Sequence, residues 1–218
     1  MFENIISNTS KTIVGNVDKI KLTLAAIISE GSILIEDYPG SGKTTFAKAI
    51  TSSLGLNFKR IQFTSDLLPS DVLGFNILSD DKLKFQKGPI FTNIVLADEL
   101  NRGSPKAQSA FLEAMEEKNV TIDGESHTLP EPFFVIATQN PMDTSGTSSL
   151  PDSQLDRFMI SYSLSDLDQK EKILMLKKNV SFSNSANETI NWSQINDKKN
   201  EITVKDEIYQ YVVEIEQT

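Results

Sequence analysis

The residues of this chain most closely tied to one chemistry lie in the run DYPGSGKTT, positions 37–45. A phosphate chain needs inward-pointing backbone N–H groups, close approach without Cβ atoms, and a positive charge near its β and γ positions. Gly40 and Gly42 allow the approach, Lys43 supplies the charge, and Thr44 supplies a hydroxyl for Mg²⁺. The run therefore predicts a phosphate-binding loop. Its predicted nucleotide-binding residues are Asp37, Tyr38, Pro39, Gly40, Ser41, Gly42, Lys43, Thr44 and Thr45.

One position departs from the G-x-x-x-x-G-K-[ST] pattern, because Asp37 stands where the first glycine is expected. Aspartate adopts left-handed backbone conformations more readily than most residues, so the turn can still form. A carboxylate beside a triphosphate would be repelled by it. We therefore expect the side chain of Asp37 to point away from the phosphates.

A second group of polar residues follows the apolar run NIVLA, which reads as a buried strand ending at Asp98 and Glu99. Ligands of open α/β sheets bind at the carboxyl ends of the strands. Asp98 would hold Mg²⁺ through water, and Glu99 would orient and deprotonate the attacking water. Acidic residues that end a strand are often only solvated, but the upstream loop makes the catalytic interpretation the stronger one. Together the two segments predict ATP binding and hydrolysis.

Length and composition limit the alternatives. A chain of 218 residues suits one large domain, or one domain with a small second one. The net charge of −9 disfavours nucleic acid or an anionic membrane as a partner, since neither is attracted to an acidic surface. Disulfides and zinc-thiolate sites are excluded because the chain has no cysteine. With no leader pattern and no long apolar run, we expect a cytoplasmic protein.

The hydrophobic periodicity predicts five apolar strands separated by helices, which is typical of a parallel sheet covered on both faces. The strands are expected at 33–36, 58–63, 93–99, 133–138 and 158–164. Helices are expected at 17–29, at 44–54, from Pro105 after a Ser104 cap, at 166–179, and from Ile208 to Thr218. Two hairpins are predicted, one around 79–82 and one turning at Asp123-Gly124.

In this order the motifs resemble those of the MoxR family of AAA+ ATPases over about residues 11–180. The matching segments are DYPGSGKT, RIQFTSDLLPSDVLGF, KGPIF, LADELNR, LPEPF, IATQNP and LPDSQLDRF. The resemblance implies an α/β fold, a P-loop NTPase αβα sandwich with strand order 5-1-4-3-2, over residues 1–164. It places an insert in helix two at about 66–90 and a hairpin before the first sensor at about 119–130. Residues 165–218 would then form an incomplete helical lid.

The resemblance also implies roles for residues outside the loop. Asn140, in IATQN, matches the sensor that helps place the attacking water. Arg157, in LDRF, matches an arginine that reaches the ATP of a neighbouring subunit. The segment Ile13, Val14 and Gly15 matches the one that lies against adenine. Asn101-Arg102 would contact a neighbouring subunit or simply form a helix-capping loop. The family's second sensor has no candidate here, so we expect a fragment or a shortened chain.

Two single residues receive no chemical role. His127 is interpreted as a solvated loop residue past a hairpin turn, and Trp192 as a packing residue of the helical lid.

By resemblance the leading function is a chaperone-like ATPase with ATP and Mg²⁺ as cofactors, acting in the maturation or remodelling of protein complexes. Members typically form hexameric rings and work with von Willebrand A-domain proteins; the client is not identified by the sequence. One alternative is a nucleic-acid-remodelling motor, for which Lys82, Lys84 and Lys87 are the only basic cluster on the inserted hairpins. The other is a regulatory module that binds nucleotide without hydrolysing it; Glu99, Asn140 and Arg157 argue against this alternative, and the missing lid argues for it.

Overall fold

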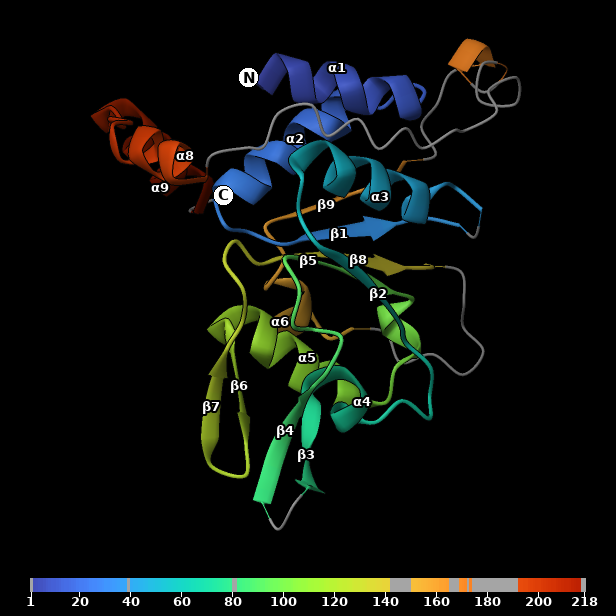
Figure 1. Ribbon diagram of the computed structural model, residues 1–218. Helices are drawn as coiled ribbons and strands as arrows, with labels where there is room; N and C mark the ends of the chain where they lie inside the picture. Colours follow the sequence, from blue (N-terminus) through green and yellow to red (C-terminus); the bar gives the residue numbers. More distant parts are fainter. Residues whose placement is uncertain are drawn as a thin grey trace.

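A parallel sheet of five strands lies at the centre of the molecule (Figure 1). A computed structural model describes residues 2–38, 40–79, 82–141, 150–164, 169–171, 173 and 192–216. In spatial order the strands are β2 (Phe58–Gln62), β5 (Ile94–Asp98), β8 (Phe134–Gln139), β1 (Ile33–Glu36) and β9 (Ile160–Tyr162). Numbered along the chain, this is the order 5-1-4-3-2 read from the other edge, so the predicted sheet is confirmed.

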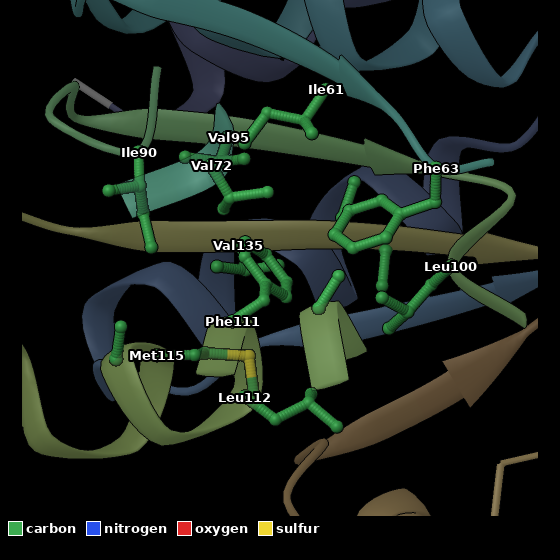
Figure 2. Packing of buried hydrophobic residues seen from close by; sticks show 14 of the residues in the cluster. Ile61, Phe63, Val72, Ile90, Val95, Leu100, Phe111, Leu112, Met115 and Val135 are labelled. Carbon is green, nitrogen blue, oxygen red and sulfur yellow. The ribbon is translucent and has the colours of Figure 1, made fainter. Parts of the chain in front are cut away.

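The strands read as continuous apolar runs because both faces of the sheet are covered. Alternate residues of β5 serve the two faces: Ile94 and Leu96 belong to one buried cluster, Val95 and Ala97 to the other. Figure 2 shows part of the second cluster, where Phe111 lies beneath the strands. Two separate cores therefore fix the sheet from above and below.

Three helices cover the face of the sheet that carries Ile94 and Leu96 (Figure 1). They are α1 (Phe2–Thr12), α2 (Val17–Ile28) and α3 (Lys43–Leu54). The last two agree with the helices expected at 17–29 and 44–54, whereas no helix was predicted for α1. Ile5 is buried and Thr9 donates a hydrogen bond to Ser53 of α3 at 3.0 Å, so α1 packs over its neighbours.

The opposite face is covered mainly by α5 (Pro105–Glu117). The Ser104 hydroxyl accepts a hydrogen bond from Ala107 N at 3.3 Å, which is the predicted cap. Three short helical segments lie on the same side: α4 (Pro69–Leu73), the 3₁₀ turn η1 (Leu100–Arg102) and α6 (Asp152–Leu155). A T-shaped contact between Phe63 and Phe111, with ring centroids 5.3 Å apart, joins the end of β2 to α5.

Two hairpins extend below this layer (Figure 1). One pairs β3 (Gly74–Ser79) with β4 (Lys82–Lys87), and the other pairs β6 (Asn119–Ile122) with β7 (Glu125–Thr128). The second turns at Asp123-Gly124, both with positive φ, as the sequence predicts. His127 is not a solvated loop residue: it lies in β7, half-buried, with its ring stacked on Phe85 at 3.9 Å. The interpretation was wrong because Phe85 belongs to the other hairpin, and the contact between the two hairpins cannot be read from the sequence of either one.

The C-terminal residues form α8 (Trp192–Asn200) and α9 (Asp206–Glu216). Trp192 and Ile195 of α8 pack against the cluster that contains α2, so Trp192 contacts the sheet-bearing core rather than only a separate lid. The predicted division at residue 164 remains a prediction. None of the helices within the described ranges is long and apolar enough to cross a membrane.

Candidate active site

The predicted phosphate-binding loop connects β1 to α3 at the carboxyl end of the sheet. Gly40 and Gly42 have φ of +85° and +89°, and a Cβ built on either would meet nothing within 4 Å. The turn therefore has the left-handed geometry that glycine allows, with open space above it. The hydroxyl of Ser41 is buried without a hydrogen-bond partner among the described residues. Pro39 lies outside the described residues.

Lys43 is the first residue of α3 and folds back over the loop. Its Nζ donates to the carbonyl oxygens of Asp37 at 2.7 Å and Tyr38 at 2.9 Å. Burial lowers the pKa of Lys43, and the nearby carboxylates of Asp37, Asp98 and Glu99 act in the opposite direction. Two of these carboxylates, Asp98 and Glu99, stand at the end of β5. The phosphate-binding loop and the acidic pair, predicted separately from the sequence, therefore lie close together. The N-terminal amides of α3 add a favourable field for an anion.

Thr44 and Thr45 follow in the first turn of α3, and both are half-buried. Thr44 directly follows Lys43, which is the position from which its hydroxyl is predicted to contact Mg²⁺.

The side chain of Asp37 is only 2% exposed and is held by backbone amides. One carboxylate oxygen accepts from Tyr38 N at 2.8 Å and the other from Leu164 N at 3.0 Å. The expectation that this side chain turns away from a phosphate is therefore met. Its partner Leu164, just beyond β9, was not foreseen because the two residues are distant in sequence.

Asp98 ends β5 with both carboxylate oxygens engaged. Thr138 Oγ1 donates to Oδ1 at 2.6 Å, and the Arg60 guanidinium pairs with Oδ2 at 2.7 Å. Thr138 is fully buried, and its hydroxyl also accepts from Glu99 N at 2.9 Å. One hydroxyl on β8 thus positions both residues of the acidic pair. The sequence analysis missed Thr138 and Arg60; the available pointer was a polar residue near the carboxyl end of each apolar strand.

Glu99 has a left-handed backbone, with φ of 54°, directly after the strand. Such strain in a non-glycine residue persists only where its surroundings enforce it, and it is concentrated at functional sites. Its carboxylate accepts from Gln62 Nε2 at 2.8 Å and pairs with Arg102 at 3.4 Å. Gln62 also accepts from Arg60, so β2 contacts both acidic residues through one pair of side chains. The sequence analysis did not find Gln62, which the register places opposite Asp98.

Asn140, the predicted sensor, follows β8 directly and is half-buried beside the acidic pair's loop. Asn101 Nδ2 donates to the Asn140 carbonyl at 3.5 Å. Asn101 is 5% exposed and therefore lies inside its own chain rather than on a surface for a neighbour. Its Oδ1 is buried with no hydrogen-bond partner among the described residues.

The remaining predicted residues lie at opposite ends of the sheet: the Ile13–Gly15 segment at the carboxyl end, beside Asn16, and Arg157 at the amino end, just before β9. Ile13, Val14 and Gly15 form the half-buried connection between α1 and α2. Arg157 follows α6 and pairs with Glu116 of α5 at 3.0 Å, with 35% of its side chain exposed. Its role in a neighbouring subunit's site stays a prediction.

The chain is similar to several known proteins. Residues 32–160 match the family model of the ATPase family associated with various cellular activities (AAA). The chaperone MoxR1 of Mycobacterium tuberculosis is 40% identical over 159 residues, covering 72% of this chain and 42% of that protein. The chain is a member of the MoxR family of AAA+ ATPases.

Two further comparisons support this membership. The uncharacterised protein YeaC of Bacillus subtilis is 53% identical over 156 residues, covering 71% of this chain and 49% of the relative. The crystal structure of a candidate ATPase from Cytophaga hutchinsonii superposes with a TM-score of 0.86 at 37% identity. The superposition covers 98% of this chain and 67% of the Cytophaga chain.

MoxR membership implies ATP binding, which agrees with the loop geometry. The chain spans about half the length of the curated relatives it matches, 49% of one and 42% of the other.

Proposed function

We propose that this chain binds ATP with Mg²⁺ and hydrolyses it. One observation carries the proposal: Lys43, Asp98, Glu99 and Asn140 follow three neighbouring strands at a single edge of the sheet. In parallel α/β sheets this edge is where ligands bind. Phosphoryl transfer relies on positioning and charge stabilisation, which is what these side chain types supply.

In the proposed mechanism, Lys43 exchanges its carbonyl partners for the β- and γ-phosphates, and the loop amides hold the remaining oxygens. Glu99 orients the attacking water and accepts its proton, while Asn140 fixes the position of that water beside the γ-phosphate. Arg157 of an adjacent subunit stabilises the charge of the transition state. Ile13, Val14 and Gly15 lie against the adenine.

The metal site would consist of Thr44 and Asp98 together with the phosphates. Among the described residues there is no cluster of three or more His, Cys, Asp or Glu that could hold a metal ion by itself. This fits Mg²⁺, which is usually bound through one or two carboxylates and the substrate phosphates. Since both Asp98 oxygens already have protein partners, contact through a metal-bound water suits this donor set. When bound, the ion neutralises charge on the phosphates.

For the wider role we propose a chaperone-like ATPase that acts in the cytoplasm as a hexameric ring on protein complexes. A von Willebrand A-domain protein is the proposed partner. The relative named as a chaperone, MoxR1, supports the class of activity, and the net charge of −9 disfavours nucleic acid as the substrate.

The proposed chemistry is tested with two variants of the purified chain. Lys43→Ala should abolish binding of a fluorescent ATP analogue, because the phosphates lose their cation. Glu99→Gln should bind the analogue normally and hydrolyse ATP at least about a hundredfold more slowly, the usual contribution of a general base. Equal loss of affinity in both variants would show that Glu99 is not the base. A wild-type chain that fails to bind ATP would contradict the proposal itself.

A further inference from the structure

The aspartate that replaces the first glycine of the phosphate loop has a structural partner far along the chain. One oxygen of Asp37 accepts from the backbone N–H of Leu164 at 3.0 Å, in a buried hydrogen bond across 127 positions. A glycine at this position has no side chain with which to form that contact. The departure from the common pattern therefore creates a connection between the loop and the end of β9.

The other backbone group of Leu164 is held as well. Its carbonyl accepts from Asn16 Nδ2 at 3.3 Å. Asn16 directly follows the Ile13–Gly15 segment, has φ of 57° and is the N-cap of α2. Leu164 itself is 3% exposed and packs in the cluster that contains α2 and α3. We call this arrangement, Asp37 and Asn16 on the backbone of Leu164, the Leu164 clamp.

We propose that Asp37 and Asn16 are positioning residues that couple occupancy of the nucleotide site to Leu164, the last described residue before the chain continues beyond the sheet. The proposal rests on the proposed function, since it assigns the phosphates to the loop and the adenine to the Ile13–Gly15 segment. Each arm of the Leu164 clamp then starts in one half of the nucleotide site.

The coupling has a direct physical route through Asp37. Its carbonyl holds Lys43 at 2.7 Å, while its carboxylate holds Leu164. A phosphate that binds Lys43 removes the contact between Lys43 and the Asp37 carbonyl. The contact between the Asp37 carboxylate and Leu164 remains. Because the carboxylate is buried and held by two amides, a shift of the loop backbone is passed to Leu164 rather than absorbed by a freely rotating side chain.

The test is amide hydrogen exchange at Leu164, with ADP as the probe. Asp37→Gly restores the common loop pattern and removes the carboxylate. Because Asp37 belongs to the predicted nucleotide-binding loop, the affinity of this variant for ADP is measured first, and exchange is compared at ADP concentrations that saturate each protein. In this variant the Leu164 amide should exchange at least about tenfold faster, since its acceptor is gone. In wild type, ADP should change the exchange rate of Leu164; in Asp37→Gly that response should be absent.

Asn16→Gly provides a second variant that leaves the phosphate loop untouched. Glycine tolerates the φ of 57°, so the change removes the side-chain donor without straining the backbone. It should reduce the ADP response at Leu164 while preserving the fold, which circular dichroism checks for both variants. Should Asp37→Gly not fold, this variant decides the question on its own.

The outcomes separate the two proposals. An unchanged ADP response of Leu164 in both folded variants overturns the clamp and leaves nucleotide binding intact. Failure of the wild-type chain to bind any nucleotide removes the proposed function and the clamp together.

Discussion

The two ends of the parallel sheet hold their charged groups in opposite settings. At the carboxyl end, Asp37 and Asp98 are buried and bonded to hydroxyl, guanidinium or backbone partners. At the amino end, Glu30 pairs with Lys118 at 2.7 Å and with Lys199 at 2.9 Å, and half of its side chain is exposed. Carboxylates thus belong to a buried network at one end and to two solvated ion pairs at the other.

Apolar and charged side chains both line the amino end. There α8 lies over a cavity of about 340 Å³ lined by Ile27, Ile28, Phe133, Trp192 and Ile195, with the Glu30 pairs at its rim. Exposed ion pairs contribute little to stability, whereas a buried polar group left without a partner is costly. The difference teaches that the carboxylates at the carboxyl end are held in place by buried partners, whereas Glu30 at the amino end forms exposed ion pairs that add little to stability. Substitutions at the two ends should therefore differ in size and in kind.

The largest effect is expected from Arg157. If it completes a neighbour's site, Arg157→Ala should bind ATP normally and lose about 10³-fold in turnover, the weight of an arginine finger. Mixed with Glu99→Gln subunits it should recover activity, because one type of junction then combines an intact Glu99 with an intact Arg157. Turnover of the mixture measures this.

A matched control separates catalysis from packing. Glu116→Gln breaks the ion pair within the chain and keeps the arginine. If Glu116→Gln lowers turnover as much as Arg157→Ala, or if the mixture stays inactive while the two variants co-assemble, Arg157 is a structural residue.

An intermediate effect is expected from Thr138 at the buried end. Thr138→Val keeps the shape but removes both hydrogen bonds of the hydroxyl, leaving Asp98 Oδ1 and Glu99 N short of a partner. Urea denaturation should show a loss of about 1–3 kcal/mol in the free energy of unfolding. Thr138→Ser keeps the hydroxyl and is the control. A valine variant as stable as the serine variant would contradict the role given to the hydroxyl.

The smallest effect is expected from Glu30 at the exposed end. Hydrogen bonds from Lys118 and Lys199 lower its pKa from 4.5 to about 2. A depressed carboxyl pKa contributes stability that is fully present above pH 4.5 and is lost as the pH falls from there toward 2. Because the pairs are exposed, Glu30→Gln should cost less than about 1 kcal/mol at pH 7, and salt should reduce that cost.

The measurement compares thermal or urea unfolding of wild type and Glu30→Gln between neutral and acidic pH. The two stabilities should converge in acid. A difference that stays constant from pH 7 to about pH 3 would show that the effect is not electrostatic.

Sequence reasoning recovered the elements whose pattern is local. The apolar strand Ile33–Glu36, the glycines of the phosphate loop and the Ser104 cap each follow from residues close in the chain. It also located the acidic pair, because a phosphate loop upstream makes a catalytic role the stronger interpretation of two carboxylates that end a buried strand.

What it missed depends on contacts between distant segments. Thr138, Arg60 and Gln62 contact the acidic pair only because β2, β5 and β8 are neighbours in a particular register. That order and register cannot be read from any one segment of the sequence. The partner of Asp37 and the stacking of His127 on Phe85 are of the same kind. Helix α1 was missed because its apolar residues are few and its burial comes from α2 and α3.

The position of Trp192 gives the molecule a built-in optical reporter. It is the only tryptophan in the chain, and it is half-buried in α8 at the amino end of the sheet. Selective excitation of tryptophan therefore records the docking of α8 without interference from any other indole. The emission spectrum can follow that docking separately from loss of the central sheet during denaturation. Since the phosphate loop lies at the far end of the same strands, a shift in this emission on adding nucleotide would record a change that had crossed the whole sheet.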